Sequence, residues 1–253
     1  MVDLRVKDGI AGVFLNRPQK SNALDAAMLE AFLSRIREIE GLPGLRVVVL
    51  AGNGKSFCGG ADVNELANLK KSTAAKFVGK IHACCDALRH LTVPVVARLH
   101  GAVIGAGLEL AASCDLRVAA EGTRFAMPEV RLGIPSVVEA ALLPRLVGAG
   151  RAAWLVLTGE AIDARTALDW GLVEELAPLA AIDERVGALL ESLVAADAAA
   201  LAAQKALLRL WQEAPLAESV AASMAAFAKA YASDAPGERM RATISSGRGT
   251  KQD

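Results

Sequence analysis

Apolar and polar positions in the first part of the chain follow two different periods. Short apolar runs over 10–18, 45–54 and 93–101 predict buried strands, and each run ends in a proline or a glycine. Residues 21–41 place apolar side chains at helical spacing and stop at Gly41, which predicts an amphipathic helix. The apolar positions of that helix are Leu29, Phe32, Leu33, Ile36 and Ile39. Buried strands alternating with helices favour an α/β chain of crossover units over a β-sandwich.

The alternation of strands and helices continues to about residue 130, and the C-terminal part of the chain is helical. A helix over about 105–113 follows the third strand, and residues 115–130 predict two short strands around a turn at Glu121–Gly122. The C-terminal part is alanine-rich and helical, with apolar stripes that are typical of a core or a subunit interface. These stripes are Val186, Leu189, Leu190 and Leu193, and later Val220, Met224, Phe227 and Tyr231. We expect a core over 1–190 and a helical region over 191–253 within the same structural unit.

Composition and charge narrow the class of protein. The chain has 253 residues, of which 53% are hydrophobic, so one large domain can bury a sizeable core. Lysine plus arginine equals aspartate plus glutamate at 28 each, without blocks of like charge. This balance argues against a nucleic-acid groove or an anionic membrane surface as the partner. Charged residues interrupt the apolar runs before the roughly 20 residues of a spanning helix, and no signal segment is recognisable, so we expect a soluble cytoplasmic protein.

Several common kinds of site are absent from the sequence. The four cysteines form no C-x-x-C pair and are expected to be buried thiols in a reducing compartment. The three histidines show no metal-binding spacing, so no metal site is expected. The G-x-S-x-G elbow of serine hydrolases does not occur. The cysteines are Cys58, Cys84, Cys85 and Cys114, and the histidines are His82, His90 and His100.

Two glycine-rich turns invite nucleotide-binding interpretations that their spacing weakens. Gly54-Lys55-Ser56 resembles the end of a P-loop, but the first glycine would fall at Val49, inside a strand. Gly59 and Gly60 then follow where a helix should begin, which leaves a nucleotide phosphatase as a weak alternative. The segment "GAVIGAG" (101–107) reads G-x-x-x-G-x-G and does not match the dinucleotide fingerprint.

A third interpretation uses both turns and one isolated carboxylate. Glu109 is the only fully charged residue between Arg98 and Asp115, and burying an ionised carboxylate is costly unless its site uses it. The two turns place Ala61 and Ala106 at strand-to-helix junctions, where backbone N–H groups lack partners. Two such groups converging on one point would form an oxyanion hole beside Glu109.

Glu129 adds a second carboxylate to this hypothesis. It follows Pro128, which removes a backbone donor and stiffens the segment. Two carboxylates that converge on an oxyanion hole would act as a general acid–base pair beside a carbonyl. From spacing alone, two glutamates on the surface are the alternative interpretation.

Four separate blocks of sequence carry a resemblance to a known family. They are "LNRPQKSNALD" (15–25), "FCGGADVNEL" (57–66), the long apolar stretch over 94–135, and "LTGEAIDARTALDWGLVEEL" (157–176). In this order and spacing, the chain resembles the enoyl-CoA hydratase/isomerase (crotonase) superfamily over nearly its whole length. The resemblance implies an α/β fold, a crotonase-like spiral of ββα units with a C-terminal helical trimerisation region. It further implies a homotrimer or a dimer of trimers.

The resemblance also implies a substrate and a set of site residues. The substrate would be a coenzyme A thioester, with no separate cofactor. Its carbonyl would accept hydrogen bonds from the N–H groups of Ala61 and Ala106. Glu109 would deprotonate water for attack at C3, and Glu129 would protonate C2 of a 2-enoyl thioester. Residues expected to contact the substrate or its CoA are Lys20, Ala23, Leu24, Gly60, Asp62, Val63, Gly105, Pro128 and Leu132.

The presence of both carboxylates favours a hydratase. A double-bond isomerase, or another enolate-forming enzyme of the family, is the alternative, and a binding protein that has lost the chemistry is a further one. One departure from the family pattern bears on the acyl pocket. Val137, Val138 and Glu139 stand where small residues are usual, which could narrow or redirect the pocket. Glu139 could add a third carboxylate, or it could point to solvent from a helix start.

Overall fold

The computed structural model describes residues 1–249. By its internal contacts the chain divides into two compact units, Met1–Ala196 and a second one that begins at Asp197. Helix α8 (Ile182–Ala195) runs across the position where the sequence led us to expect the start of the C-terminal region. This helix belongs to the first unit because it packs on that unit's sheet.

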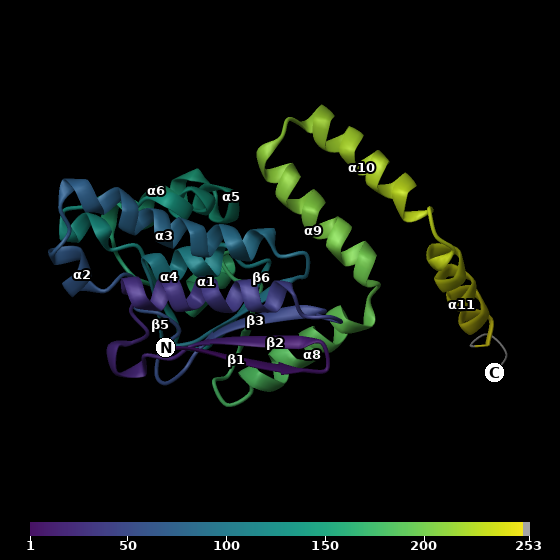
Figure 1. Ribbon diagram of the computed structural model, residues 1–253, viewed down its shortest axis with the longest axis horizontal. Helices are drawn as coiled ribbons and strands as arrows, with labels where there is room; N and C mark the ends of the chain where they lie inside the picture. The colour runs from purple at the N-terminus through teal and green to yellow at the C-terminus, as the bar shows by residue number, and fades with distance from the viewer. Residues whose placement is uncertain (250–253) are drawn as a thin grey trace. The chain divides into compact units, whose positions relative to one another are not determined.

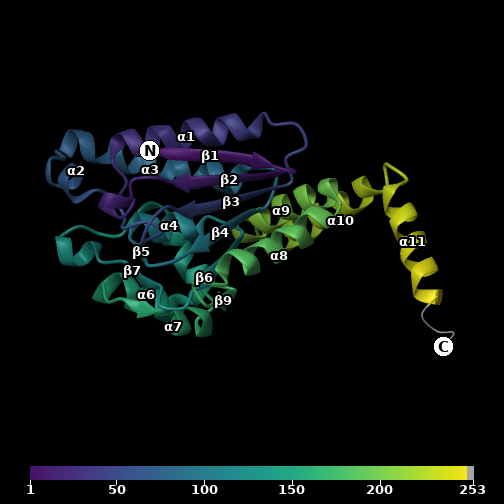
Figure 2. The same ribbon diagram turned by 90° about the horizontal axis from the view of Figure 1, so that it is seen from below.

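A six-stranded sheet forms the centre of the first unit, in the order β1-β2-β3-β4-β6-β9. Its strands are β1 (Val2–Lys7), β2 (Ile10–Leu15), β3 (Val47–Gly52), β4 (Val95–Leu99), β6 (Leu116–Ala120) and β9 (Glu175–Ala177). Strands β1 and β2 form an antiparallel hairpin, and every later pair in the sheet is parallel. Figure 2 shows the strands side by side in this order. Parallel neighbours require crossover connections, which the helices supply.

Helices cover both faces of this sheet. On one face lie α1 (Ala26–Glu40), α3 (Lys71–His90) and α4 (Ala106–Ala112), as Figure 1 shows for α1 and α3. Strand β3 is buried throughout, and alternate side chains of a strand point to opposite faces. Val48 and Leu50 therefore enter the core on the α1 side, while Val47 and Val49 pack with α8.

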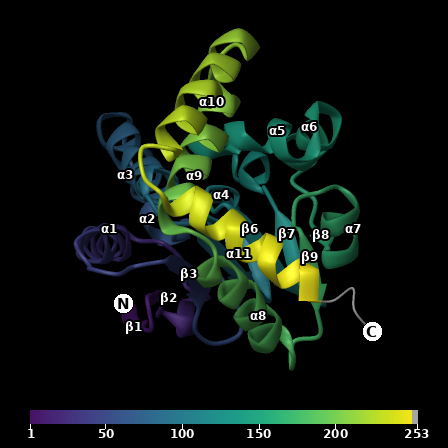
Figure 3. The same cartoon turned by 90° about the vertical axis from the view of Figure 1, so that its right-hand side faces the viewer.

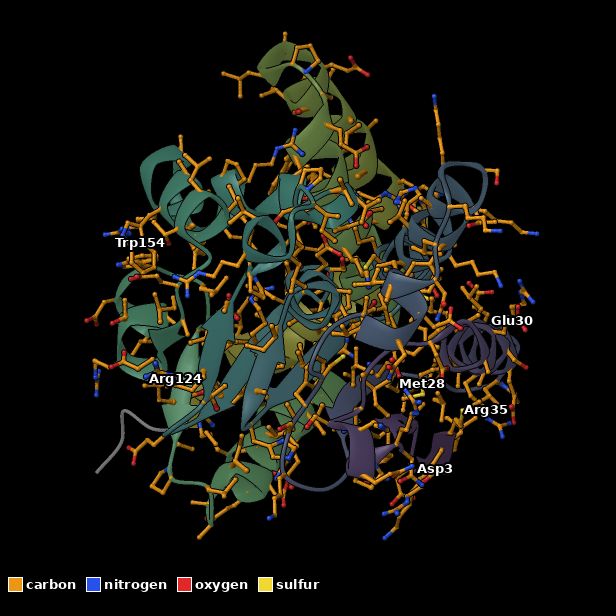
Figure 4. All side chains as sticks on the ribbon, turned by 90° about the vertical axis from the view of Figure 1, so that its left-hand side faces the viewer. Asp3, Met28, Glu30, Arg35, Arg124 and Trp154 are labelled. Atoms are coloured by element: carbon orange, nitrogen blue, oxygen red, sulfur yellow. The ribbon has the colours of Figure 1, made fainter. Side chains whose placement is uncertain are left out.

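Helix α1 shows how the amphipathic pattern is used. Met28 faces the interior, whereas Glu30 and Arg35 lie on the outer side of the helix (Figure 4). The helix begins at Ala26, later than its sequence pattern suggested, because the Asp25 carboxylate accepts a hydrogen bond from Met28 N at 2.8 Å and caps it. Gly41 follows its last residue, as predicted.

A second, small sheet contains β5 (Ala102–Ile104), β7 (Arg124–Ala126) and β8 (Ile162–Asp163), and Figure 3 shows β7 and β8 beside α7. The chain passes from β4 of the large sheet to β5 of the small one, then through α4 back to β6 and on to β7. This alternation is the predicted spiral of ββα units, so the predicted fold class is confirmed. The remaining helices of this unit are η1 (Pro18–Lys20), α2 (Val63–Ala67), η2 (Glu129–Leu132), η3 (Val138–Leu142), α5 (Leu143–Val147), α6 (Ala149–Thr158) and α7 (Ala164–Asp169).

The second unit is helical, with α9 (Ala198–Glu213), α10 (Leu216–Ala230) and α11 (Ala235–Gly249). The Trp211 indole N–H donates to Ser223 Oγ at 3.1 Å and ties α9 to α10. The apolar stripe of α10 is exposed, with Phe227 at 68%, so it does not form an intrachain core. Within the described residues, no single helix is long and apolar enough to cross a membrane, although α8 and α9 taken together across their break meet that threshold.

Several elements were not predicted from the sequence, among them the short strands β5, β8 and β9. Strand β1 was missed, and so was α3, the longest helix of the first unit. The signal for α3 is nonetheless present, because its buried side chains recur at helical spacing. They are Phe77, Ile81, Cys84, Cys85 and Leu88. All four cysteines of the chain are buried, and no disulfide joins them within residues 1–249.

Candidate active site

The loop after β3 runs beside β5 and is held from two sides. Cys58 N donates to Ala102 O at 3.0 Å, and Ile104 N donates to Cys58 O at 3.0 Å. On its other side, Leu24 N donates to Gly60 O at 2.8 Å, and Asp62 N donates to Leu24 O at 2.9 Å. This pairing brings a loop near residue 60 against the start of α4, although about 45 residues separate them in the chain.

The backbone hydrogen bonds around this loop do not involve the N–H groups of Ala61 and Ala106. Neither donates a hydrogen bond to another group within residues 1–249. Ala106 is the first residue of α4, where backbone N–H groups have no intrahelical acceptor and the helix dipole favours negative charge. Gly60, with φ +95°, permits the approach: a Cβ there would lie 2.8 Å from Ile104 O and 3.8 Å from Ala106 N.

Glu109 lies one turn into α4 and is only 5% exposed. Its Oε1 accepts a hydrogen bond from Ala140 N at 3.3 Å. Burial raises the pKa of Glu109 to about 8, and the charge of Glu129 adds to this, while the Ala140 bond opposes it. Glu109 is therefore a buried residue and not a glutamate on the surface. The pKa of its carboxyl lies near neutral pH.

Glu129 begins η2 directly after Pro128 and points back at the start of α4. A Cβ built on Gly105 would lie 2.4 Å from Glu129 Oε1, so the carboxylate packs on the bare backbone of that glycine. Its other oxygen, Oε2, accepts a hydrogen bond from Ser136 Oγ at 2.9 Å. The two glutamates thus converge at the N-terminal end of α4.

The residues expected to contact CoA are spread over three places. Lys20 is exposed at the end of η1, and Ala23 and Leu24 follow it next to the loop that holds Gly60 and Ala61. Val63 is 61% exposed at the start of α2, and Leu132 is 56% exposed at the end of η2.

Asp62 has a clear structural role. Its carboxylate pairs with Arg17 Nη1 at 2.6 Å and caps α2 by accepting from Asn64 N at 2.9 Å. The bond from Arg17 holds the pKa of Asp62 below its usual range. Arg17 Nη1 also donates to Ala23 O at 3.1 Å, so this ion pair joins the two segments expected to contact CoA.

Sequence analysis did not identify Ser136, Ala140 or His82 as members of the site. Ser136 and Ala140 lie in the segment that departs from the family pattern, and each bonds one of the two glutamates. His82 of α3 contacts Glu139 of η3, with 2.7 Å between Nδ1 and Oε1. No local motif marks these residues, because the partners of Ala140 and His82 are 31 and 57 positions away.

Other predicted kinds of site find no support in the geometry. Lys55 is exposed in a turn, and the next helix begins only at Val63, which contradicts a P-loop. No group of three or more metal-ligating side chains occurs among residues 1–249. A cavity of about 1050 Å³ lies on the other face of the large sheet, lined by Lys55 and Arg98 among others, and neither catalytic glutamate candidate lines it.

Comparisons with known proteins identify the family of the chain. The sequence model of the family described as enoyl-CoA hydratase/isomerase matches residues 5–242. YngF, a Bacillus subtilis relative, is 41% identical over 169 residues, which cover 66% of this chain and 65% of that protein. The short-chain-enoyl-CoA hydratase of Clostridium acetobutylicum is 39% identical over 173 residues, covering 67% of this chain and 66% of the relative.

A solved structure extends the similarity to the whole fold. The crystal structure of an enoyl-CoA hydratase from Mycobacterium smegmatis superposes with a TM-score of 0.92 at 32% sequence identity. It covers 97% of this chain, and this chain covers 96% of it. The chain is therefore an enzyme of the enoyl-CoA hydratase/isomerase family.

Proposed function

We propose that this enzyme is an enoyl-CoA hydratase, a hydro-lyase that adds water across the 2,3 double bond of a 2-enoyl-CoA thioester. One observation carries the proposal: Glu109 and Glu129 converge on the start of α4, close to the backbone N–H groups of Ala61 and Ala106, which have no acceptor within residues 1–249. A single carboxylate would serve an isomerase, whereas hydration needs one group to take a proton and one to give it.

The oxyanion hole comes from Ala61 and Ala106. Their N–H groups donate to the thioester carbonyl oxygen, which becomes negative as the enolate forms. Each preorganised donor of this kind contributes on the order of 3 kcal/mol to such a state. Gly60 lets the loop that carries Ala61 approach Ile104, and Gly105 leaves room for Glu129, since neither glycine has a side chain.

The glutamates supply the proton transfers. Ionised Glu109 accepts a proton from water while the water oxygen bonds to C3, and the electrons of the double bond move toward the thioester oxygen. Glu129 then delivers its proton to C2, which gives a 3-hydroxyacyl-CoA. Glu109 loses its proton to solvent and Glu129 regains one, so the net reaction consumes one water. Burial, the largest cause of the raised pKa of Glu109, makes it a stronger base than an ordinary glutamate.

The remaining expectations fit this proposal. Lys20, Ala23, Leu24, Asp62 and Val63 line the CoA moiety, which enters as part of the substrate, and no separate cofactor or metal takes part. The exposed apolar residues after Glu129, such as Leu132, and neighbouring Pro128 are available to the acyl chain. The exposed stripe of α10 supports assembly as a homotrimer or a dimer of trimers. Buried cysteines without disulfides among the described residues suit the cytoplasm.

The test is a spectrophotometric assay with crotonyl-CoA, which follows loss of the conjugated enoyl-thioester absorbance. Glu109→Gln and Glu129→Gln are each expected to lower kcat by at least about 100-fold. Glu40→Gln, on the exposed end of α1, is the matched control and keeps wild-type activity. If Glu109→Gln keeps most of its activity on a double-bond-shift substrate while wild type fails to hydrate crotonyl-CoA, the enzyme is an isomerase instead.

A further inference from the structure

A third carboxylate is buried next to the proposed acid–base pair. Glu139 is 5% exposed, and its Oε1 lies 2.7 Å from Nδ1 of His82, whose side chain is about half exposed. Its Oε2 is buried and has no hydrogen-bond partner within residues 1–249. A buried carboxylate oxygen in this state lowers stability, and such exceptions in native structures call for a functional explanation.

The backbone that carries Glu139 is strained. Val138, the residue before it, has φ +43°, in the left-handed region that a β-branched side chain rarely occupies. The same turn directs Ala140 N toward both Val137 O, at 3.0 Å, and Glu109 Oε1, at 3.3 Å. Strain of this kind persists where surrounding structure enforces it, often at active sites. The strained turn therefore places the N–H group of Ala140 against Glu109 and the carboxylate of Glu139 near it.

The groups that face Glu109 come from three elements. Glu129 of η2 and Glu139 of η3 both act on it by charge, and Cys85 of α3 interacts with both Glu109 and Glu139. Burial and these carboxylates raise the pKa of the Cys85 thiol well above its usual range, so it stays neutral. His82, also of α3, contacts Glu139 and opens toward solvent. Through His82, a half-exposed side chain therefore contacts a carboxylate whose charge acts on Glu109.

We propose that Glu139, held by His82, is a further positioning residue of the hydration reaction, which acts on Glu109 through its charge. This inference rests on the proposed function for its role in turnover. A negative charge beside Glu109 disfavours its ionised form, so Glu139 makes Glu109 a stronger base. The contact with His82, 2.7 Å between Nδ1 and Oε1, holds the Glu139 carboxylate in this position.

The experiment compares Glu139→Gln, His82→Ala and the double variant over a range of pH. The acid limb of kcat/KM for crotonyl-CoA, where Glu109 takes up its proton, is expected to move to lower pH by about one unit in Glu139→Gln. His82→Ala moves it in the same direction by less, and the double variant matches Glu139→Gln, because His82 acts through Glu139. His90→Ala, on the same helix and paired with Asp86, leaves the limb in place.

A second readout does not depend on turnover. Titration of the Glu109 carboxyl by ¹³C NMR, assigned by its absence in Glu109→Gln, is expected to show the same shifts. An unchanged Glu109 titration in Glu139→Gln, or effects of the two single variants that simply add, would overturn the inference. If Glu139→Gln does not fold, the shift in His82→Ala alone decides. Shifted NMR titrations without crotonyl-CoA turnover would refute the proposed function and leave this coupling intact.

Discussion

Oε1 of Glu129 occupies the space beside Gly105 in which a side chain would have to fit: a Cβ on that glycine would come within 2.4 Å of it. Gly105 is also the residue before α4, with φ +52°. The glycine therefore serves both the turn into the helix and the placement of the second carboxylate. Contact between these two residues links the proposed oxyanion hole to the proposed acid–base pair.

Gly105→Ala is expected to impair catalysis and stability together. The new Cβ displaces the Glu129 carboxylate, and alanine resists the positive φ. We expect kcat for hydration to fall at least about 100-fold and the free energy of unfolding to fall by about 1–3 kcal/mol. Enzyme assay and urea titration measure the two effects. The matched control is Gly79→Ala in α3, where nothing lies within 4 Å; it should keep full activity and gain about 0.5–1 kcal/mol. An active Gly105→Ala enzyme would contradict the role of this contact.

Glu109 makes the stability of the fold depend on pH. Its pKa rises from 4.5 to about 8 in the folded chain, so between these values the folded state keeps a proton that the unfolded chain releases. Below pH 4.5 burial of the neutral carboxyl carries no ionisation penalty. The free energy of unfolding falls progressively as pH rises from 4.5 through 8, by up to about 5 kcal/mol in total.

Glu109→Gln removes this dependence. Urea titrations at pH 5.5 and pH 9 should show that wild type loses more stability than the variant between the two values. Because all other titrating groups are shared, their effects cancel in the comparison. Parallel losses in the two proteins would show that Glu109 titrates normally in the folded state.

Ser136→Ala removes the hydrogen bond to Glu129 Oε2. Orientation of the acid by one bond to a charged group is worth about 1.5 kcal/mol, so we expect kcat to fall about tenfold with little change in KM. Ser136→Thr retains the hydroxyl and should recover most of the activity. Equal defects in the alanine and threonine variants would indicate that packing, and not the hydrogen bond, matters at this position.

Arg17→Met breaks the ion pair that joins the two segments expected to contact CoA. Asp62 is 5% exposed, and removal of its ion-pair partner leaves the buried carboxylate with only its hydrogen bonds from Asn64. The free energy of unfolding should fall by about 3–5 kcal/mol, and KM for acyl-CoA should rise. Arg35→Met, which removes an exposed pair with Glu38 on α1, should cost less than about 1 kcal/mol. Chemical denaturation of both variants and wild type tests the contrast.

Much of the local structure follows from the sequence pattern. The apolar runs that become β2, β3 and β4 were recognisable, and so were α1 and α4, because buried strands and amphipathic helices leave their period in the residues. Strand β1 was missed. It is an edge strand of mostly part-buried and exposed residues, which carries little of that signal.

For the candidate site, the types of functional residue could be predicted from the sequence, but most of the contacts between them could not. A lone carboxylate in an apolar helix, Glu109, and small residues at two turns suggested an oxyanion hole with a base. Ala140 and His82 could not be found this way, since their partners are 31 and 57 positions away in the chain. Ser136 lies only seven positions from Glu129, but no local motif marks their contact. Hydrogen bonds of this kind depend on which elements pack together, and local propensity does not encode that.

By itself, then, the sequence determined the α/β class, the glycine turns and the family resemblance, because these depend on residue type and short-range spacing. Only the tertiary structure decided that Glu129 packs on Gly105 and that Glu139 is buried against His82. It also decided that the loop carrying Ala61 lies next to the start of α4, where Ala106 is. The physical reason is that parallel sheets join segments far apart in the chain. Burial then sets the proton affinity of each carboxyl from its surroundings, not from its neighbours in sequence.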